Sequence, residues 1–162
     1  MIGIGKRVYR FLKLQREAVW LVYNASNIDK NSGLLRRAYA KLAARRLALR
    51  FGIYVAPSAR VGTGLVLPHP TGIVIGEGAV IGSNVTIYQH VTIGRRRSDT
   101  PSYPNIGDRV TIYAGAVIVG GIDIGPRSAI GANCVVMNDV ADDSVVRPCV
   151  VAQVKPCATD SK

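Results

Sequence analysis

Aromatic side chains are scarce in this sequence of 162 residues, at 6%, so its interior must be built from aliphatic side chains. No apolar run approaches the roughly 20 residues that a membrane-spanning helix needs. The three cysteines are odd in number and form no Cys-x-x-Cys pair, which indicates a reducing compartment rather than a disulfide framework. No apolar stretch follows the basic residues at the start, so we expect no signal peptide and a cytoplasmic protein. At 48% hydrophobic residues, the chain can build one folded domain.

Acidic residues are nearly absent from the first 50 positions, which hold 12 Lys and Arg residues against 2 acids. The remaining positions are almost neutral, with 9 basic residues against 8 acids. We therefore expect a separate basic segment at residues 1–50. Apolar residues recur at helical spacing on both sides of a polar stretch at 24–33, which predicts two helices, with Asn31 or Ser32 capping the second. The predicted apolar stripe of the second helix consists of Leu35, Ala38, Leu42 and Leu49.

Three interpretations of this basic segment stay open. Its helices can pack on the rest of the protein or on a sister subunit and expose a solvated basic face. A basic amphipathic helix can also make peripheral contact with an anionic membrane, here its inner face. Nucleic acid is the third interpretation. We expect no nucleic acid partner, because no aromatic platform or nucleic-acid motif accompanies the charge.

Residues 51–154 carry a repeat with a period of six. The repeated aliphatic positions are Val55, Val61, Leu67, Ile75, Ile81, Ile87, Ile93, Ile106, Ile112, Ile118, Ile124, Ile130 and Val136. A parallel β-helix with six residues on each of three sides produces this period, whereas an α-helix or a flat sheet does not. Residues that tolerate positive φ are expected at its corners, at Gly78, Asn84, His90, Gly115, Gly121, Asn133 and Asp139. The period is broken by a two-residue slip before Ile75 and by an extruded loop at 95–105.

Residues 67–94 resemble the hexapeptide-repeat acyltransferases, and more narrowly their serine O-acetyltransferase branch, which includes bacterial polysaccharide O-acetyltransferases. The resemblance rests on the repeated aliphatic-Gly pattern and on His-Pro-Thr-Gly at 69–72, and it covers about residues 53–146. It implies a mainly β fold, a left-handed parallel β-helix behind a short α-helical segment. It also implies acetyl-CoA as acyl donor and a homotrimer with sites at the subunit boundaries. Two histidines are too few for the three-histidine zinc site of a β-helical carbonic anhydrase, so we expect no metal.

His69 is the first candidate catalytic residue. It lies at the slip in the repeat between Pro68 and Pro70, where the coil must bulge and the loop is stiff. An imidazole held there suits a general base that takes the proton from a hydroxyl as its oxygen attacks a thioester, and the resemblance implies the same role. His90 falls on a corner near the same edge of the coils. It is therefore the second candidate, which would orient the substrate or share the role of base.

The candidate acceptor-binding residues are Tyr54, Arg95, Arg96 and Tyr103. The arginines at 95–97 open the extruded loop and can meet phosphate or an anionic saccharide. The resemblance implies Asp in place of Tyr54 and Pro68, and His in place of Tyr103, in enzymes that acetylate serine. The acid that binds the amino group of serine is therefore expected to be missing. The Tyr54 hydroxyl is expected to hydrogen-bond His69 instead of a carboxylate.

We therefore predict an O-acetyltransferase that acts on a hydroxyl of a sugar or polysaccharide. Serine O-acetylation is the alternative activity, and a non-catalytic trimeric scaffold with membrane-facing helices is the alternative of another class. The resemblance implies that the pantetheine arm of acetyl-CoA lies along the coils beside small residues, at Gly94, Ala114, Gly115, Gly131 and Ala132. Residues 155–162 are expected to form a C-terminal tail.

Overall fold

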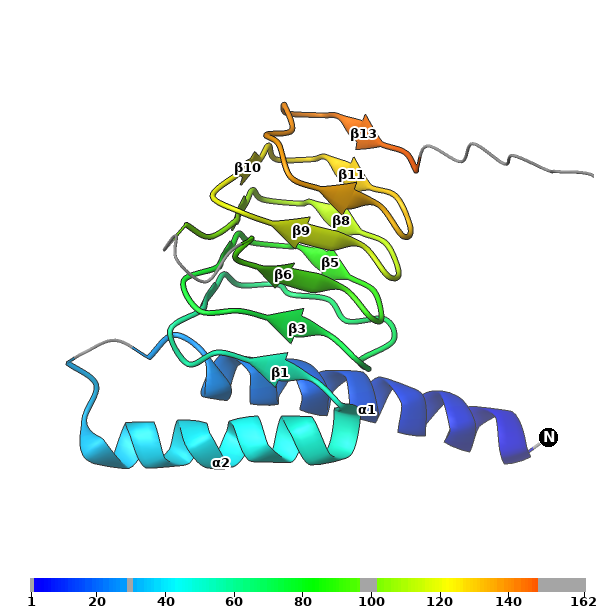
Figure 1. The fold of residues 1–162 in the computed structure, drawn as a ribbon. Helices are drawn as coiled ribbons and strands as arrows, with labels where there is room; N and C mark the ends of the chain where they lie inside the picture. The colour runs from blue at the N-terminus through cyan, green and yellow to red at the C-terminus, as the bar shows by residue number, and fades with distance from the viewer. Residues whose placement is uncertain (1, 29–30, 97–101, 149–162) are drawn as a thin grey trace, which may run out of the picture.

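Short strands wind into a three-sided coil that stands on two helices (Figure 1). The computed structural model describes residues 2–28, 31–96 and 102–148. The helices are α1 (Ile2–Ala25) and α2 (Leu34–Phe51). No helix within these ranges is long and apolar enough to cross a bilayer. The predicted tail of residues 155–162, together with Arg97, lies outside the described residues.

Thirteen strands of two or three residues follow the helices in the described part of the chain. They are β1 (Tyr54–Val55), β2 (Arg60–Val61), β3 (Val74–Ile75), β4 (Val80–Ile81), β5 (Thr86–Ile87), β6 (Thr92–Gly94), β7 (Asn105–Ile106), β8 (Thr111–Ile112), β9 (Val117–Val119), β10 (Asp123–Ile124), β11 (Ala129–Ile130), β12 (Val135–Val136) and β13 (Val145–Val146). Parallel pairing gives three sheets, in the orders β1-β3-β6-β9-β12, β2-β4-β7-β10 and β5-β8-β11-β13. We call these the first, second and third sides of the coil.

Aliphatic side chains stack along the axis of the coil. On the first side, Ile75, Ile93 and Ile118 occupy paired positions in β3, β6 and β9, and all three are buried. Every predicted aliphatic position of the repeat from Val55 to Val136 is buried in the same way. The prediction of a parallel β-helix is therefore confirmed. Removal of this aliphatic column from water is the main contribution that stabilises such a fold.

The corners of the coil need a backbone φ near +60°, which residues other than glycine adopt rarely. Five of the seven predicted corner residues have positive φ, namely Gly78, Asn84, His90, Gly115 and Asn133. The prediction was wrong at Gly121 and Asp139. It missed the glycines Gly64, Gly72 and Gly120 and, among other residues of the coil, Arg109, Arg127 and Asp143. The Arg109 N–H donates to the Ser83 carbonyl and the Arg127 N–H to the Asp108 carbonyl, so contacts between coils impose the corner geometry whatever the side chain.

Arg127 also donates hydrogen bonds to Asp143, which lower the pKa of that exposed carboxyl.

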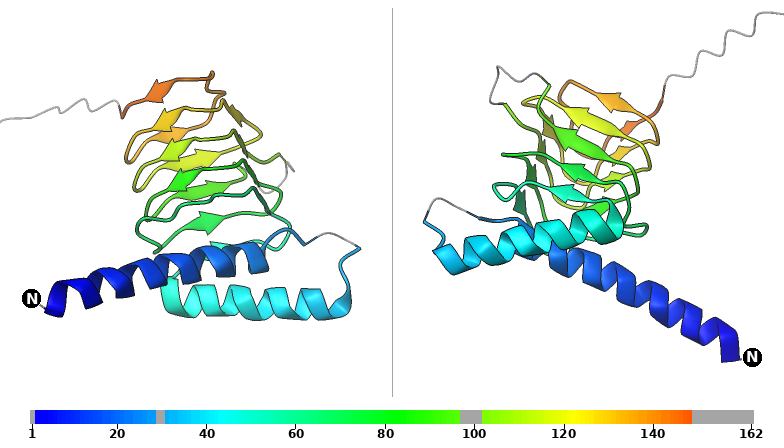
Figure 2. Two further views of the ribbon diagram at one scale, coloured as in Figure 1. Left: turned by 180° about the vertical axis from the view of Figure 1, so that it is seen from behind. Right: turned by 60° about the horizontal axis from the view of Figure 1, so that its bottom comes forward.

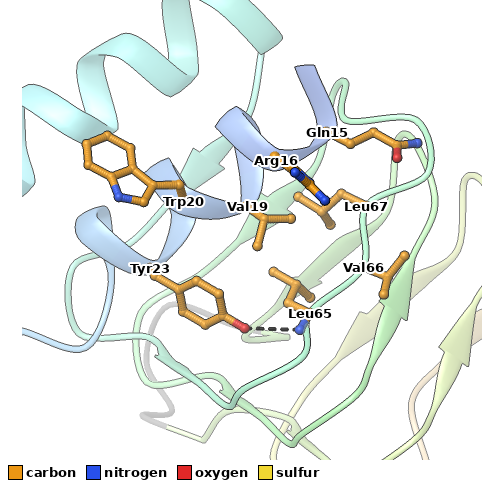
Figure 3. A pocket seen from close by; sticks show the side chains of 8 residues that line it. All are labelled: Gln15, Arg16, Val19, Trp20, Tyr23, Leu65, Val66 and Leu67. Atoms are coloured by element: carbon orange, nitrogen blue, oxygen red, sulfur yellow. Dashed lines mark hydrogen bonds between the residues drawn. The ribbon is translucent and has the colours of Figure 1, made fainter. Parts of the chain in front are cut away.

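The first helix closes the lower end of the coil. Its buried side chains are Ala18, Leu21, Val22 and Ala25. The Tyr23 hydroxyl donates to the Gly62 carbonyl at 2.8 Å and accepts from the Leu65 N–H at 3.0 Å, beside a hollow of about 370 Å³ (Figure 3). Helix α1 thus satisfies backbone groups of the first coil, which has no coil below it.

The second helix packs through a different face from the predicted stripe. Its buried side chains are Ala40, Ala43, Leu47 and Phe51. The predicted stripe, Leu35, Ala38, Leu42 and Leu49, is exposed instead. The alanines allow close approach to α1, which crosses beside α2 at the end of the coil (Figure 2). The predicted cap is also wrong, because Gly33 is the N-cap and makes no side-chain hydrogen bond.

Candidate functional site

His69 lies between β2 and β3, where the helices meet the coil. The Gln15 side chain donates to the carbonyl of Pro68 at 2.6 Å, so α1 holds this loop. The His69 side chain is exposed and lines a pocket of about 370 Å³ with residues of both helices. The other lining residues are Leu14, Gln15, Arg50, Phe51, Pro70 and Thr71. An imidazole in such a pocket can reach a bound hydroxyl and exchange its proton with solvent.

His90 lies at the same corner of the coil, one coil further from the helices. Its backbone N–H donates to the carbonyl of Thr71 at 3.0 Å. Its ring lies over Gly72, where a Cβ atom would overlap Nδ1. The corner therefore brings His69 and His90 to one edge of the stack, as the repeat predicts. The catalytic roles of the two histidines stay predictions.

A pair of tyrosines continues this edge. The ring of Tyr88 lies 6.2 Å from that of His69, measured between centroids. Tyr88 in turn stacks on Tyr113 at 5.3 Å and 19°. Such aromatic faces offer a flat apolar surface beside the imidazole of His69.

A second pocket, of about 240 Å³, collects most of the predicted acceptor residues. Tyr54, Arg95 and Tyr103 line it together with Gly76 and Glu77. Tyr103 packs closely against Gly78, where a Cβ atom would overlap its ring. Arg96 does not line this pocket and lies beside Gly120. The acceptor-binding roles of these residues also stay predictions.

Within one protomer, Tyr54 does not orient His69 as we expected. Within the described residues no hydrogen bond joins the two side chains, and the pockets of His69 and Tyr54 share no lining residue. The reason is geometric. Tyr54 begins β1 and projects from the first side of the coil, whereas His69 stands on the loop that leads to the corner before β3.

Glu77 is the residue that the sequence analysis missed. It follows Gly76 directly after β3 and is exposed in the pocket of Tyr54 and Tyr103. A carboxylate at a corner of a repeat is ordinary in sequence, so the period gives no signal for it. Only the return of the chain after the extruded loop, which brings Tyr103 back over Gly78, shows that Glu77 faces a pocket.

The five residues predicted to hold the pantetheine arm lie on two corners. Ala114 and Gly115 follow β8, and Gly131 and Ala132 follow β11, in the column above His90. The Gly115 N–H donates to the Gln89 carbonyl, which ties this column to the His90 turn. Gly94 ends β6 at the other corner of the first side and has open space where a Cβ would lie. Binding of the pantetheine arm by these residues stays a prediction.

Gly72→Ala is expected to displace the ring of His90, because the new methyl group would occupy the position of Nδ1. Gly52→Ala is the matched control, since Gly52 has a φ of 61° against 64° for Gly72 and its added Cβ would meet only ordinary contacts. In both variants the free energy of unfolding should fall by about 1–2 kcal/mol, because alanine is strained at a positive φ. Imidazole NMR signals should shift for His90 in Gly72→Ala alone. Equal spectra for the two variants would contradict the contact.

The comparisons with known proteins agree on one family. The model for bacterial transferase hexapeptide repeats (six repeats) matches residues 103–138. Serine acetyltransferase of Staphylococcus xylosus is 40% identical over 130 residues, which make up 80% of this chain and 59% of that protein. Soybean serine acetyltransferase complexed with serine is 43% identical with a TM-score of 0.63, over 70% of this chain and 48% of that chain. A serine acetyltransferase in complex with CoA is 36% identical with a TM-score of 0.62, over 68% and 45%.

A three-sided parallel β-helix built on a six-residue repeat defines the class of hexapeptide-repeat transferases. The chain belongs to the hexapeptide-repeat acyltransferase family. The predicted left-handed parallel β-helix behind a short helical segment is confirmed with it. The chain spans less than two thirds of the length of the relatives that it matches.

Proposed function

We propose that this chain transfers an acetyl group from acetyl-CoA to an acceptor hydroxyl, with His69 as general base. The observation that carries the proposal is the corner that places an exposed His69 in a pocket, with His90 and a column of small residues above it. The relatives named serine acetyltransferase, one of them solved with CoA, support acetyl-CoA as the donor.

The reaction needs one proton carrier. The acceptor oxygen attacks the carbonyl carbon of the thioester while the imidazole of His69 takes its proton. The tetrahedral intermediate then collapses, the C–S bond breaks, and the CoA sulfur leaves with the proton that His69 held. The products are an O-acetyl ester and CoA thiol, and His69 returns to its neutral form. His90, at the same corner, would orient the substrate.

The proposed site is complete only between protomers of a homotrimer. In one protomer the pocket of His69 and the pocket of Tyr103 are separate, so base and acceptor residues do not meet. A neighbouring protomer that sets its Tyr103 pocket against His69 would bring them together. A closed threefold assembly would then contain three equivalent sites.

Serine is the acceptor that the comparisons favour over a sugar, since the relatives are named serine acetyltransferases and one was solved with serine. The pocket of Tyr103 supports the same choice, because Glu77 and Arg95 place a carboxylate and a guanidinium in one small cavity. An amino acid carries one ammonium and one carboxylate group, which such a pair can bind by charge-assisted hydrogen bonds. Glu77 would thus replace the amine-binding acid that the sequence analysis expected to be missing.

A sugar hydroxyl is the second candidate acceptor. The stacked rings of Tyr88 and Tyr113 beside His69 form a flat surface of the kind on which a sugar ring can lie. Tyr54 and Tyr103 add two further hydroxyl-bearing rings in the other pocket. We include in the proposal the predicted contact of residues 1–50 with an anionic membrane, where a lipid-linked saccharide would be found.

The experiment that tests this function measures release of CoA thiol from acetyl-CoA in the presence of L-serine, simple sugars or oligosaccharides. We expect L-serine to give the highest kcat/KM. Faster release with a saccharide would move the proposal to the second acceptor. Absence of release with every acceptor, together with no binding of acetyl-CoA by calorimetry, would overturn the enzyme proposal in favour of the non-catalytic scaffold.

Glu77→Gln is expected to raise the KM for L-serine by about 10- to 100-fold, because a hydrogen bond to a charged group is worth about 1.5–3 kcal/mol. The KM for acetyl-CoA in the same variant is the internal control and should stay unchanged. Asp142→Asn removes another exposed carboxylate, at the far end of the coil, and should leave both constants unchanged. An unaltered KM for L-serine in Glu77→Gln would remove Glu77 from the acceptor pocket.

A further inference from the structure

The outer face of α2 carries a stripe of leucines that no described residue covers. Leu35, Leu42 and Leu49 are 87%, 63% and 78% exposed. Their spacing of seven residues aligns them on one stripe of the helix. The buried residues of α2, Ala40, Ala43, Leu47 and Phe51, lie on a nearly opposite stripe. The exposed leucines therefore contribute little to the packing of α2 against α1 and the coil.

Arginines flank this stripe. A shallow recess of about 600 Å³ is lined by two of the leucines and by Arg45, Arg46 and Arg50. Glu17 on α1 pairs with Arg46 and Arg50 at 3.2 Å each, and three guanidinium groups against this one carboxylate leave a surplus of two positive charges. We call Leu35, Leu42, Leu49 and these three arginines the basic leucine face.

The charge of this face favours one kind of binding partner over two others. Residues 31–51 contain no acidic residue, so two copies of the face brought together would repel each other. A nucleic acid would satisfy the arginines but would leave three leucines against polar phosphates. An anionic bilayer satisfies both groups, since its phosphates meet the arginines and its acyl boundary takes the leucines.

The position of the face suits a planar partner. Helix α2 lies across the end of the coil, with its long axis transverse to the stack of strands (Figures 1 and 2). Its outer side therefore points away from the coil and from the column of His90. In a trimer with parallel coil axes, all three basic leucine faces would lie at the same end of the assembly. Three weak contacts made together bind far more tightly than one.

We propose that the basic leucine face docks the protein on a bilayer rich in anionic phospholipid. The helix lies in the interface, with the leucines among the upper acyl carbons and the arginines at the phosphates. The inference deepens the membrane contact included in the proposed function and does not depend on acetyl transfer. Binding and CoA release are measured separately, so the failure of one leaves the other standing.

The test is co-sedimentation of the full chain with vesicles. Vesicles of equal parts phosphatidylglycerol and phosphatidylcholine should bind about 25-fold tighter than phosphatidylcholine alone, since each of two surplus charges contributes about fivefold. Binding should fall steeply near 1 M salt, where the Debye length is ~3 Å. Equal binding to both vesicles, or none to either, would overturn the proposal.

Leu35→Ser/Leu42→Ser/Leu49→Ser is expected to weaken vesicle binding about tenfold or more, with CoA release unchanged. The matched control is Val135→Ser/Met137→Ser/Val145→Ser, which removes three side chains of 62%, 43% and 63% exposure at the other end of the coil. It should bind like the unaltered protein.

A loss of oligomer size in the leucine variant would assign the face to a second copy of the chain. Binding of duplex DNA that the leucine variant alone loses would assign the face to nucleic acid. Either result contradicts the proposal.

Discussion

His69→Ala is expected to lower kcat for acetyl transfer by about 10²- to 10⁴-fold, the usual contribution of a positioned general base. Without the imidazole, the proton of the acceptor hydroxyl must pass to water as the oxygen attacks the thioester. The KM for acetyl-CoA should change little, because the small residues predicted to hold the pantetheine arm lie at the end of β6 and after β8 and β11, outside the His69 loop. Release of CoA thiol at saturating acceptor measures the effect.

The side chain of His69 is exposed, so its removal should leave the folded state intact. The melting temperature and the affinity for acetyl-CoA therefore control for loss of structure. Met137→Ala, at an exposed position of the last coils, should keep full activity. His90→Ala should cost less than His69→Ala, since His90 is proposed to orient the substrate. A kcat within twofold of the unaltered protein in His69→Ala, with a large loss in His90→Ala, would move the base to His90.

Ile112→Ala is expected to lower the free energy of unfolding by about 2–5 kcal/mol, the range for large-to-small changes in a packed core. Ile112 in β8 lies in register between Ile87 of β5 and Ile130 of β11, and all three side chains are fully buried. A cavity here removes contacts with the coils on both sides, and the rigid backbone ladder limits collapse around it. Urea denaturation at fixed protein concentration measures the loss.

Ile112→Val should cost only about 0.5–1.5 kcal/mol, because a single methylene group is removed. Val135→Ala is the surface control. Val135 lies beside Val136 in β12 but points outward with 62% exposure, so its loss should stay within about 0.5 kcal/mol. A cost below about 1 kcal/mol for Ile112→Ala would contradict the view that the aliphatic column carries the stability of the coil.

The architecture of the coil was predictable because its signal is local and repeated. Each six-residue unit places one aliphatic side chain on the axis. The buried column from Val55 to Val136 could therefore be predicted from the sequence alone. The helices were harder to predict. Leu35, Leu42 and Leu49 form as good a stripe in sequence as Ala40, Ala43 and Leu47, and only the contact with α1 chooses the alanine face.

The candidate site was predictable in part. The slip in the repeat pointed to His69, and the period placed His90 on the same edge. The expected hydrogen bond between Tyr54 and His69 does not form within one protomer, because the two residues stand on different parts of the first coil and line different pockets. Glu77 escaped notice since its importance depends on the extruded loop bringing Tyr103 to the same pocket. The sequence pointed to a sugar as acceptor because the amine-binding acid was expected to be missing, whereas the relatives that the chain resembles are named serine acetyltransferases.

The order of residues along the chain alone predicted the three-sided coil of this protein, since a period of six fits aliphatic side chains that are buried on the axis of such a coil. Tertiary structure decided everything that depends on neighbours a coil or more apart. It folds the ring of His90 over Gly72, gathers Glu77 with Tyr103, and leaves the leucines of α2 facing outward. The physical reason is that stacking joins residues distant in sequence through contacts that a repeat does not encode.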